Sequence, residues 1–318
     1  MEFGAHLPLM SFGSERPTLS SLMTYVRAAR DLGFDWVTAN DHLIFHGPWL
    51  DGQAALATIL PEADGMTLAT TIGLPVLRHP APFAKALGAL DALSGGRVIA
   101  GVGPGSHRQD YALTGLPWEE RWPRFDEAIQ TLRALWNPDA PAFKGRFYST
   151  DGVRLEPAPS RPGGPPIWIG SWGSDAGLRR VARLGDGWLA SAYNTTPEGF
   201  VDARARLGRF LEDAGRDPEA LPSALASMFF YVTGDRARVQ DAVSAIATAL
   251  NRPAEEARER LLIGSAAECV EKLSGFASAG VERILMWPIG DDLAQLDVFA
   301  KEIATELRSS AETPGGAS

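Results

Sequence analysis

The chain has 318 residues, of which 45% are hydrophobic and 22% charged, with a net charge of −9 and an isoelectric point near 5.1. This composition is typical of a globular protein, and it excludes nucleic acid and anionic membrane surfaces as partners, because both need a basic face. One cysteine excludes an internal disulfide framework. The sequence shows neither a bilayer-spanning apolar run nor a signal-peptide start, so we expect a cytoplasmic protein.

A helix-like stretch, a glycine and a β-rich run follow one another repeatedly along the chain. The pattern occurs at Gly33, Gly95, Gly185 and Gly280. Glycine just past a helix end adopts the left-handed conformation at little cost and so ends the helix. The repetition predicts βα units arranged around a parallel sheet.

The predicted strands alternate with amphipathic helices. Strands are predicted over residues 3–7, 36–39, 67–74, 97–102, 166–170, 187–191, 225–232 and 283–287. Helices are predicted over residues 19–32, 82–93, 119–135, 175–184, 197–214, 236–250 and 266–279. Several strands are apolar throughout, as expected when both faces are covered. Eight strands in this alternation predict an α/β (β/α)8 TIM barrel, with a doubly wound open sheet as the structural alternative.

Two intervals between the predicted strands are long. Residues 103–165 contain a helix and a small hairpin at 143–148, which predicts an insertion after the fourth strand. Between the seventh and eighth strands, two helices flank residues 251–253. We expect no second domain, but a single domain over residues 1–308 and a disordered tail, rich in Ser, Ala, Gly and Pro, over residues 309–318.

Polar side chains of a barrel enzyme collect in the loops that follow the strands. The histidines all lie at or just after the ends of the first four predicted strands: His6, His42, His46, His79 and His107. This placement indicates that the C-terminal mouth of the barrel is the working face. His42, which follows Asp41 at a strand end, is the candidate for function. A metal site is not expected, because no His-x-His pair follows the first strand and no histidine follows His107.

The loop after the fifth predicted strand suits an anion. It consists of Gly170, Ser171, Trp172, Gly173 and Ser174 and leads into a predicted helix. Its glycines let a ligand approach the backbone, and Ser174 can cap the helix, whose first N–H groups and dipole favour a phosphate. Arg179 and Arg180 follow within two turns. Trp172 and Trp287, both near strand ends, have two interpretations, stacking on a planar ring or packing in the core.

Several short motifs occur together along the chain. They are Asn40-Asp41-His42-Leu43, Leu77-Arg78-His79-Pro80, Gly101-Val102-Gly103-Pro104-Gly105, Glu119-Glu120-Arg121-Trp122, Pro166-Ile167-Trp168-Ile169-Gly170 and Gly185-Asp186-Gly187-Trp188. Together, and over almost the whole chain, they resemble the luciferase-like monooxygenase superfamily, within its branch of oxidoreductases that depend on coenzyme F420 or FMN.

The resemblance implies a TIM barrel with an insertion after the fourth strand, and roles for the residues near the reactive ring of the cofactor. Asp41 and His42 would lie beside that ring, with His42 as the group that transfers a proton. A cis peptide bond that does not involve proline would support the ring near Thr70, Thr71 and Ile72.

The resemblance also implies a place for the rest of the cofactor. The loop from Gly170 to Ser174 would hold its phosphate, in agreement with the anion site predicted from the residues. Gly103 and Ser106 would contact the cofactor from the loop after the fourth strand. The relatives that oxidise sugar phosphates carry a glutamate at the position of Ser106, so glucose-6-phosphate oxidation is not expected here.

Three functions stay open at this stage. The favoured one is hydride transfer with F420 to or from a small organic substrate. The second is an FMN-dependent monooxygenase that uses O2 and reduced flavin supplied by a separate flavin reductase. The third is a non-catalytic flavin-binding protein, against which the presence of Asp41, His42 and the phosphate loop argues. The resemblance further implies a homodimer.

Overall fold

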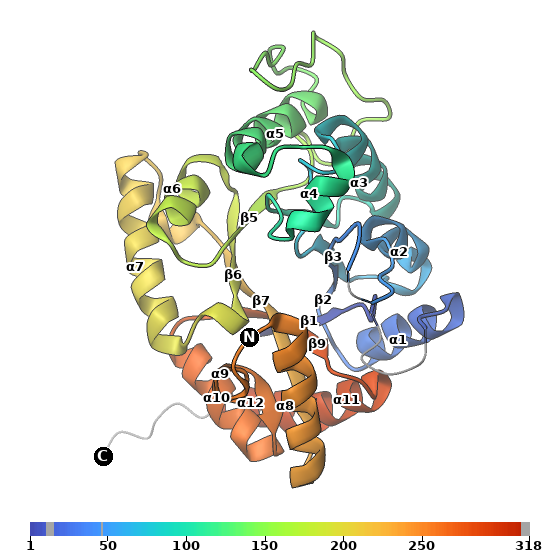
Figure 1. Cartoon of the computed structure of the whole chain (residues 1–318), viewed down its shortest axis with the longest axis vertical. Coiled ribbons are helices and arrows are strands. Elements are labelled where there is room, and N and C mark those ends of the chain that lie inside the picture. Colours follow the sequence, from blue (N-terminus) through green and yellow to red (C-terminus); the bar gives the residue numbers. More distant parts are fainter. Residues whose placement is uncertain (11–15, 46, 313–318) are drawn as a thin grey trace.

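The computed structural model describes residues 1–10, 16–45 and 47–312. Within these ranges, eight parallel strands form a closed barrel, because the last barrel strand pairs with the first (Figure 1). They are β1 (Glu2–His6), β2 (Trp36–Ala39), β3 (Thr67–Thr70), β4 (Val98–Val102), β5 (Ile167–Ser171), β6 (Gly187–Ser191), β7 (Ser223–Val232) and β9 (Arg283–Pro288). The predicted (β/α)8 barrel is confirmed, and the alternative of an open sheet is wrong.

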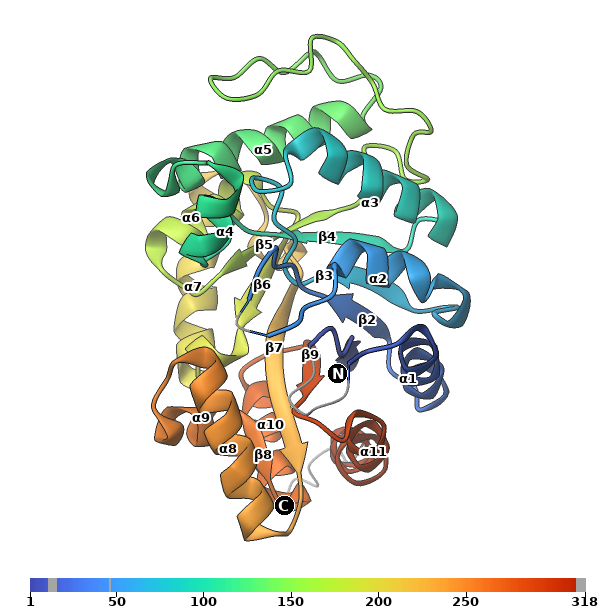
Figure 2. The same cartoon turned by 45° about the vertical axis from the view of Figure 1, so that its right-hand side comes forward.

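Helices surround the barrel (Figures 1 and 2). They are α1 (Leu19–Asp31), α2 (Gly52–Thr58), α3 (Pro80–Ser94), α4 (Arg108–Thr114), α5 (Arg121–Trp136), α6 (Asp175–Leu184), α7 (Pro197–Asp213), α8 (Arg236–Leu250), α9 (Ala254–Arg260), α10 (Ala266–Ser278), α11 (Asp292–Val298) and α12 (Thr305–Glu312). Short helical turns lie at Leu60–Glu62, Trp118–Glu120, Ala192–Asn194, Pro218–Ala220 and Phe299–Ala304. Among the described residues, no helix has the length and apolar character that crossing a membrane requires.

The last helix extends beyond residue 308, where the sequence predicted that ordered structure ends. Helix α12 continues into the segment that was expected to be a disordered tail. Residues 313–318, together with His46, lie outside the described residues.

Local sequence sets where the helices begin and end. The side chain of Ser174 accepts a hydrogen bond from the N–H of Gly177 at 3.3 Å and so caps α6. At α10, Ser265 and Glu268 form a reciprocal capping box. Helix α3 ends at Gly95, which has a φ of 70°, so this helix-to-strand joint is made as the glycine pattern predicted.

The interior of the barrel is a packed core of its own. It is filled by Trp36, Ala69, Ile99, Trp168, Leu189, Ala224, Ala226 and Leu285, which come from seven of the described barrel strands. Ile72, just after β3, packs against this cluster. Because side chains fill the barrel, a ligand has to bind among the loops at its mouth.

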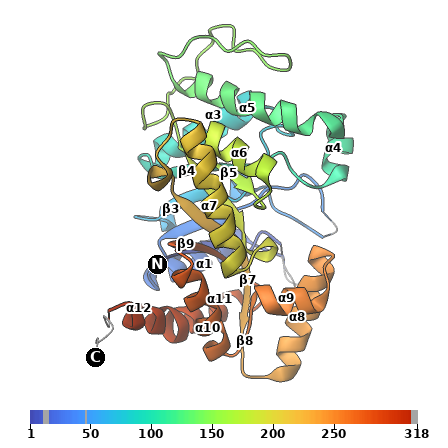
Figure 3. The ribbon, with the colours of Figure 1, turned by 90° about the vertical axis from the view of Figure 1, so that its left-hand side faces the viewer.

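The two long intervals contain short elements that the sequence did not predict. After β4, the insertion holds α5 and a hairpin closed by the bridge between Lys144 and Ser149, as expected, and also the short helix α4, which was missed. The connection from α5 to β5 then loops out at the top of the molecule (Figure 1). After β7, the strand β8 (Leu262–Gly264) was missed, because three residues are too few to show a periodic pattern. It pairs with the last residues of β7, beside α8 and α10 (Figure 3).

Candidate active site

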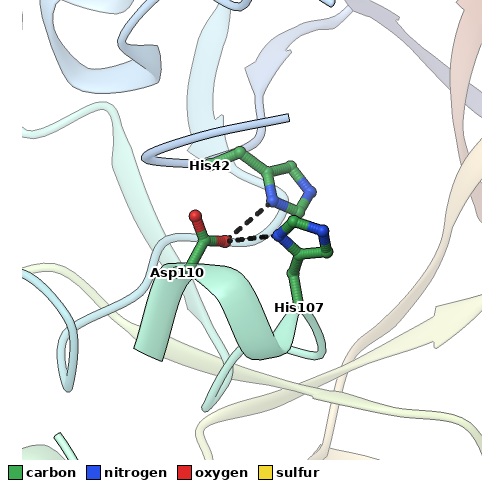
Figure 4. Close-up of side chains that lie close together, drawn as sticks. All are labelled: His42, His107 and Asp110. Carbon is green, nitrogen blue, oxygen red and sulfur yellow. Dashed lines mark hydrogen bonds and ion pairs between the residues drawn. The ribbon is translucent and has the colours of Figure 1, made fainter. Parts of the chain in front are cut away.

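His42 lies in the loop after β2 and has its partner in α4 (Figure 4). Its Nδ1 is 3.1 Å from Oδ2 of Asp110, and Nδ1 of His107 is 3.7 Å from the same oxygen. The other oxygen of Asp110 accepts backbone N–H groups from Leu43 at 3.2 Å and Ile44 at 2.9 Å. The side chain of Asp110 is only 1% exposed. The structure thus joins His42 to a buried carboxylate that sequence reasoning did not single out.

Asp110 is ionised at neutral pH. Burial opposes its negative charge, but the hydrogen bonds from His42 and from the N–H of Ile44 outweigh burial and hold its pKa below the ordinary value. An imidazole joined to an anionic carboxylate is an arrangement suited to proton transfer.

Asp41 is engaged by an arginine from the neighbouring loop. Its two oxygens each accept a hydrogen bond from Arg78, both at 2.6 Å, and the N–H of Leu74 approaches one of them at 3.3 Å. Arg78 also pairs with Asp51 at 2.6 Å. Burial by itself lowers the pKa of Arg78, but the bonds to these two carboxylates raise it above the ordinary value. Both oxygens of Asp41 therefore hold the loops after β2 and β3 together, and its place beside the cofactor ring stays a prediction.

Aromatic rings gather around His42. Its ring centroid lies 4.9 Å from that of Phe45 and 4.8 Å from that of Trp49, and Trp49 approaches Trp287 at 5.7 Å. Trp287 is 2% exposed and stacks on His6 at 3.7 Å. Of its two interpretations, core packing is therefore the one that the structure supports.

The segment after β3 has the backbone that the resemblance implied. The peptide bond between Thr71 and Ile72 is cis, and β3 ends at Thr70 rather than at residue 74. The hydroxyl of Thr70 donates to the carbonyl of Gly101 at 2.7 Å. A Cβ on Gly103 would lie 2.1 Å from Cδ1 of Ile72. Only glycine at position 103 lets the Ile72 side chain reach its observed place.

A cavity of about 270 Å³ lies beside the loop after β5. Its wall includes Ser171, Trp172 and Gly173 from this loop, Thr195, Thr196 and Gly199 at the start of α7, and the basic residues Arg206 and Arg260. The hydroxyl of Thr196 caps α7 by accepting the N–H of Gly199 at 3.2 Å. Hydroxyl groups, a helix N-terminus and two guanidinium groups around one cavity suit a phosphate group. We call this cavity the phosphate pocket.

Only some residues of the predicted phosphate loop line the phosphate pocket. Ser171, Trp172 and Gly173 line the phosphate pocket, with the side chain of Trp172 59% exposed. Ser174 instead caps α6, and a Cβ on Gly170 would touch Ile72 at 3.1 Å. Ser106, the other predicted cofactor contact, is exposed in the loop before α4 and does not line this pocket.

The basic residues of the pocket are not the ones that follow the loop in sequence. Arg179 lies over the ring of Phe210 at 3.9 Å, and Arg180 pairs with Asp126 on α5. Neither lines the phosphate pocket. Their closeness to the loop in sequence suggested that they contact the anion, but the turn of α6 directs both side chains to neighbouring helices.

Arg206 and Arg260 reach the pocket from α7 and α9. Arg206 is partly neutralised by Asp175 at 2.6 Å and Asp202 at 2.9 Å. Arg260 forms an ion pair with Glu256 at 3.5 Å and donates a hydrogen bond to the carbonyl of Tyr193 at 3.3 Å. The sequence offered no signal for Arg260, which lies in a short helix far along the chain from the loop.

Comparison with known proteins agrees with this fold. Residues 1–258 match the model of the luciferase-like monooxygenase family. An F420-dependent hydroxymycolic acid dehydrogenase of Mycobacterium tuberculosis is 29% identical, over 90% of this chain and 84% of that protein. An F420-dependent glucose-6-phosphate dehydrogenase of Beutenbergia cavernae is 28% identical, over 91% of this chain and 93% of that protein.

The fold has a close structural match as well. An F420-dependent secondary alcohol dehydrogenase, solved with an F420-acetone adduct, superposes with a TM-score of 0.82 at 21% identity, over 95% of this chain and 98% of that chain. With the family match covering most of its length, this chain belongs to the luciferase-like monooxygenase family and is an oxidoreductase of the luciferase-like type.

Proposed function

We propose that the protein binds coenzyme F420 and catalyses hydride transfer between F420 and a small organic substrate. The observation that carries the proposal is the similarity to F420-dependent dehydrogenases over about nine-tenths of the chain. The phosphate pocket and the loops around His42 supply residues that suit the two ends of such a cofactor.

The phosphate pocket fits the phosphate of the cofactor. Ser171 and Thr195 offer hydroxyl groups, and the start of α7 offers backbone N–H groups. Gly173, with a φ of 86°, holds a backbone conformation that side chains rarely adopt. Arg260 adds positive charge. In this proposal these groups hold the phosphate and so fix the cofactor along the mouth of the barrel.

The ring end of the cofactor is proposed to lie against the segment from Thr70 to Ile72. Bound F420 supplies or accepts the hydride. His42 then exchanges the accompanying proton with the substrate, and Ile72 presents an apolar surface to the ring. Asp41 and Arg78 act only by holding the loops in place.

The surroundings of His42 favour a substrate with apolar surface. Phe45 and Trp49 lie against its ring. The resemblance to the family implies a glutamate at the position of Ser106 in the relatives that oxidise sugar phosphates, and this chain has serine there. We therefore propose an organic alcohol or carbonyl compound in preference to a sugar phosphate.

Cofactor binding tests the proposal directly. We expect purified protein to quench F420 fluorescence on titration and to bind F420 more tightly than FMN. The phosphate-free deazaflavin precursor should bind more weakly than F420, because it leaves the phosphate pocket empty. Tight binding of FMN without binding of F420 would contradict the proposal and favour the FMN-dependent monooxygenase.

A pair of capping variants tests the pocket. Thr196→Ala removes the cap of α7 at the phosphate pocket, and Ser265→Ala removes the cap of α10, which does not line it. Each substitution should cost about 1 kcal/mol of stability. Only Thr196→Ala should also weaken F420 binding. Equal F420 affinity of the two variants would show that the phosphate lies elsewhere.

A further inference from the structure

We propose that Asp110 is a positioning residue that fixes the ring of His42 in the tautomer with its proton on Nδ1, leaving Nε2 as the atom that exchanges a proton with the substrate. The inference rests on the proposed function for what the proton is used for, but the contacts that define the tautomer are independent of it. Asp110 lies in α4, on the insertion after β4, and reaches across to the loop after β2.

The hydrogen bonds of Asp110 leave one oxygen for His42. Its Oδ1 already accepts the backbone N–H groups of Leu43 and Ile44. Its Oδ2 is the oxygen that lies 3.1 Å from Nδ1 of His42. An ionised carboxylate can only accept hydrogen bonds, so Nδ1 of His42 has to be the donor. The same contacts tie the loop that carries His42 to α4.

The two nitrogens of the His42 ring therefore face different surroundings. Its Nδ1 points to Asp110, and its Nε2 lies on the opposite side of the ring (Figure 4). Neutral imidazole with a proton on Nδ1 has an acceptor at Nε2, which can take a proton from a substrate hydroxyl and return it in the reverse direction. The proton on Nδ1 would stay in place throughout, and bound F420 would supply or accept the hydride.

His107 makes the cluster resemble a metal site, which is the competing interpretation. The ligand atoms of His42, His107 and Asp110 all lie within 4.8 Å of one another. The contact of 3.1 Å is that of a hydrogen bond, and two backbone N–H groups already occupy the other oxygen of Asp110. These contacts account for the ionised carboxylate without a cation. We therefore favour the positioning role, and the test includes a metal probe.

Asp110→Asn is the informative substitution. The two backbone N–H groups need an acceptor, so the amide oxygen of asparagine should face Leu43 and Ile44. Its NH2 group then faces His42 and should drive the proton from Nδ1 to Nε2. A wrong tautomer of this kind lowers kcat about 10⁴-fold in the Ser-His-Asp hydrolases. The side chain keeps its size, so the loop should keep its attachment.

The decisive experiment determines which ring nitrogen of His42 carries the proton. In protein labelled with ¹⁵N-histidine, two-dimensional NMR should show His42 with its proton on Nδ1 in the wild type and on Nε2 in Asp110→Asn. His42→Gln assigns the signal by its loss. Asp186→Asn is the control, since Asp186 also accepts a backbone N–H, from Ile167 at 2.9 Å, but lies away from His42. It should leave the signal of His42 unchanged.

Turnover gives a second readout, with isopropanol and acetone as probe substrates. We expect Asp110→Asn to lower kcat about 10³- to 10⁴-fold with F420 affinity within twofold of the wild type. Asp186→Asn should keep its kcat. If the wild type binds no F420 or turns over neither probe, the result contradicts the proposed function. The NMR measurement still decides the role of Asp110 in that case.

Three results would overturn the positioning role. The first is a wild-type His42 with its proton on Nε2, and the second is a tautomer that Asp110→Asn does not change. The third is stoichiometric binding of Co²⁺, seen as visible absorption bands that vanish in Asp110→Asn, which would make the cluster a metal site instead.

Discussion

The imidazole of His6 lies buried at the end of β1, where both of its ring nitrogens are engaged. Its Nε2 accepts the backbone N–H of Asn40 at 3.1 Å, so its Nδ1 carries the proton and donates to the carbonyl of Leu7 at 2.7 Å. The residue is 2% exposed. Burial lowers its pKa from 6.5 to about 3, because a charged ring would lose water and turn a second N–H toward Asn40.

This shift makes the folded protein sensitive to acid. Above pH 6.5 the ring is neutral in both the folded and the unfolded chain, and its contribution to stability is fully present. As the pH falls from 6.5 towards 3, the unfolded chain takes up a proton that the folded chain does not. At pH 5, which is 1.5 units below the unfolded pKa of 6.5, this proton uptake should lower the free energy of unfolding by about 2 kcal/mol.

Urea unfolding, followed by tryptophan fluorescence between pH 7.5 and 4.5, measures how far the free energy of unfolding falls. Other titrating groups contribute as well, so the quantity to compare is the difference between the wild type and His6→Gln. Glutamine does not ionise in this range. The variant loses the stacking on Trp287 at every pH, but it should lose about 2 kcal/mol less than the wild type on going from pH 7.5 to 5. Parallel curves for the two proteins would refute the argument.

Two further substitutions test the packing of the mouth and the barrel by urea unfolding. Arg78→Met leaves the carboxylate of Asp41 buried without its ion pair and should cost about 3–5 kcal/mol; a loss below about 1 kcal/mol would mean that solvent reaches Asp41. Gly101→Ala places a Cβ 2.0 Å from the carbonyl oxygen of Thr70 and should cost at least about 1–3 kcal/mol. Its control Gly234→Ala has no atom within 4 Å of the added Cβ and should stay within about 0.5 kcal/mol of the wild type; equal losses would contradict the packing argument.

Several features of the fold follow from local chemistry and could be predicted from the sequence. Glycine ends some of these helices, as Gly95 does with a φ of 70°, although Gly185 after α6 is extended with a φ of −92°. Apolar runs between helices become strands that helices cover on both faces. Four joints of this kind carried the barrel prediction. The loop from Ser171 to Gly173 was predictable for the same reason, because its glycine and the cap at Ser174 are local signals.

Only the tertiary structure decided which side chains meet at the mouth of the barrel. Asp110 is 68 positions from His42, and Arg78 is 37 positions from Asp41. The spacing of His107 and Asp110 on one helix was a signal for a cluster, but nothing in it pointed to His42. Such pairings arise because the barrel brings the ends of distant strands to one mouth, and no periodic pattern in the sequence records them. The sequence thus determined the scaffold and the place of its chemistry, and the closed barrel decided that Asp41 holds loops together while His42 is paired with Asp110.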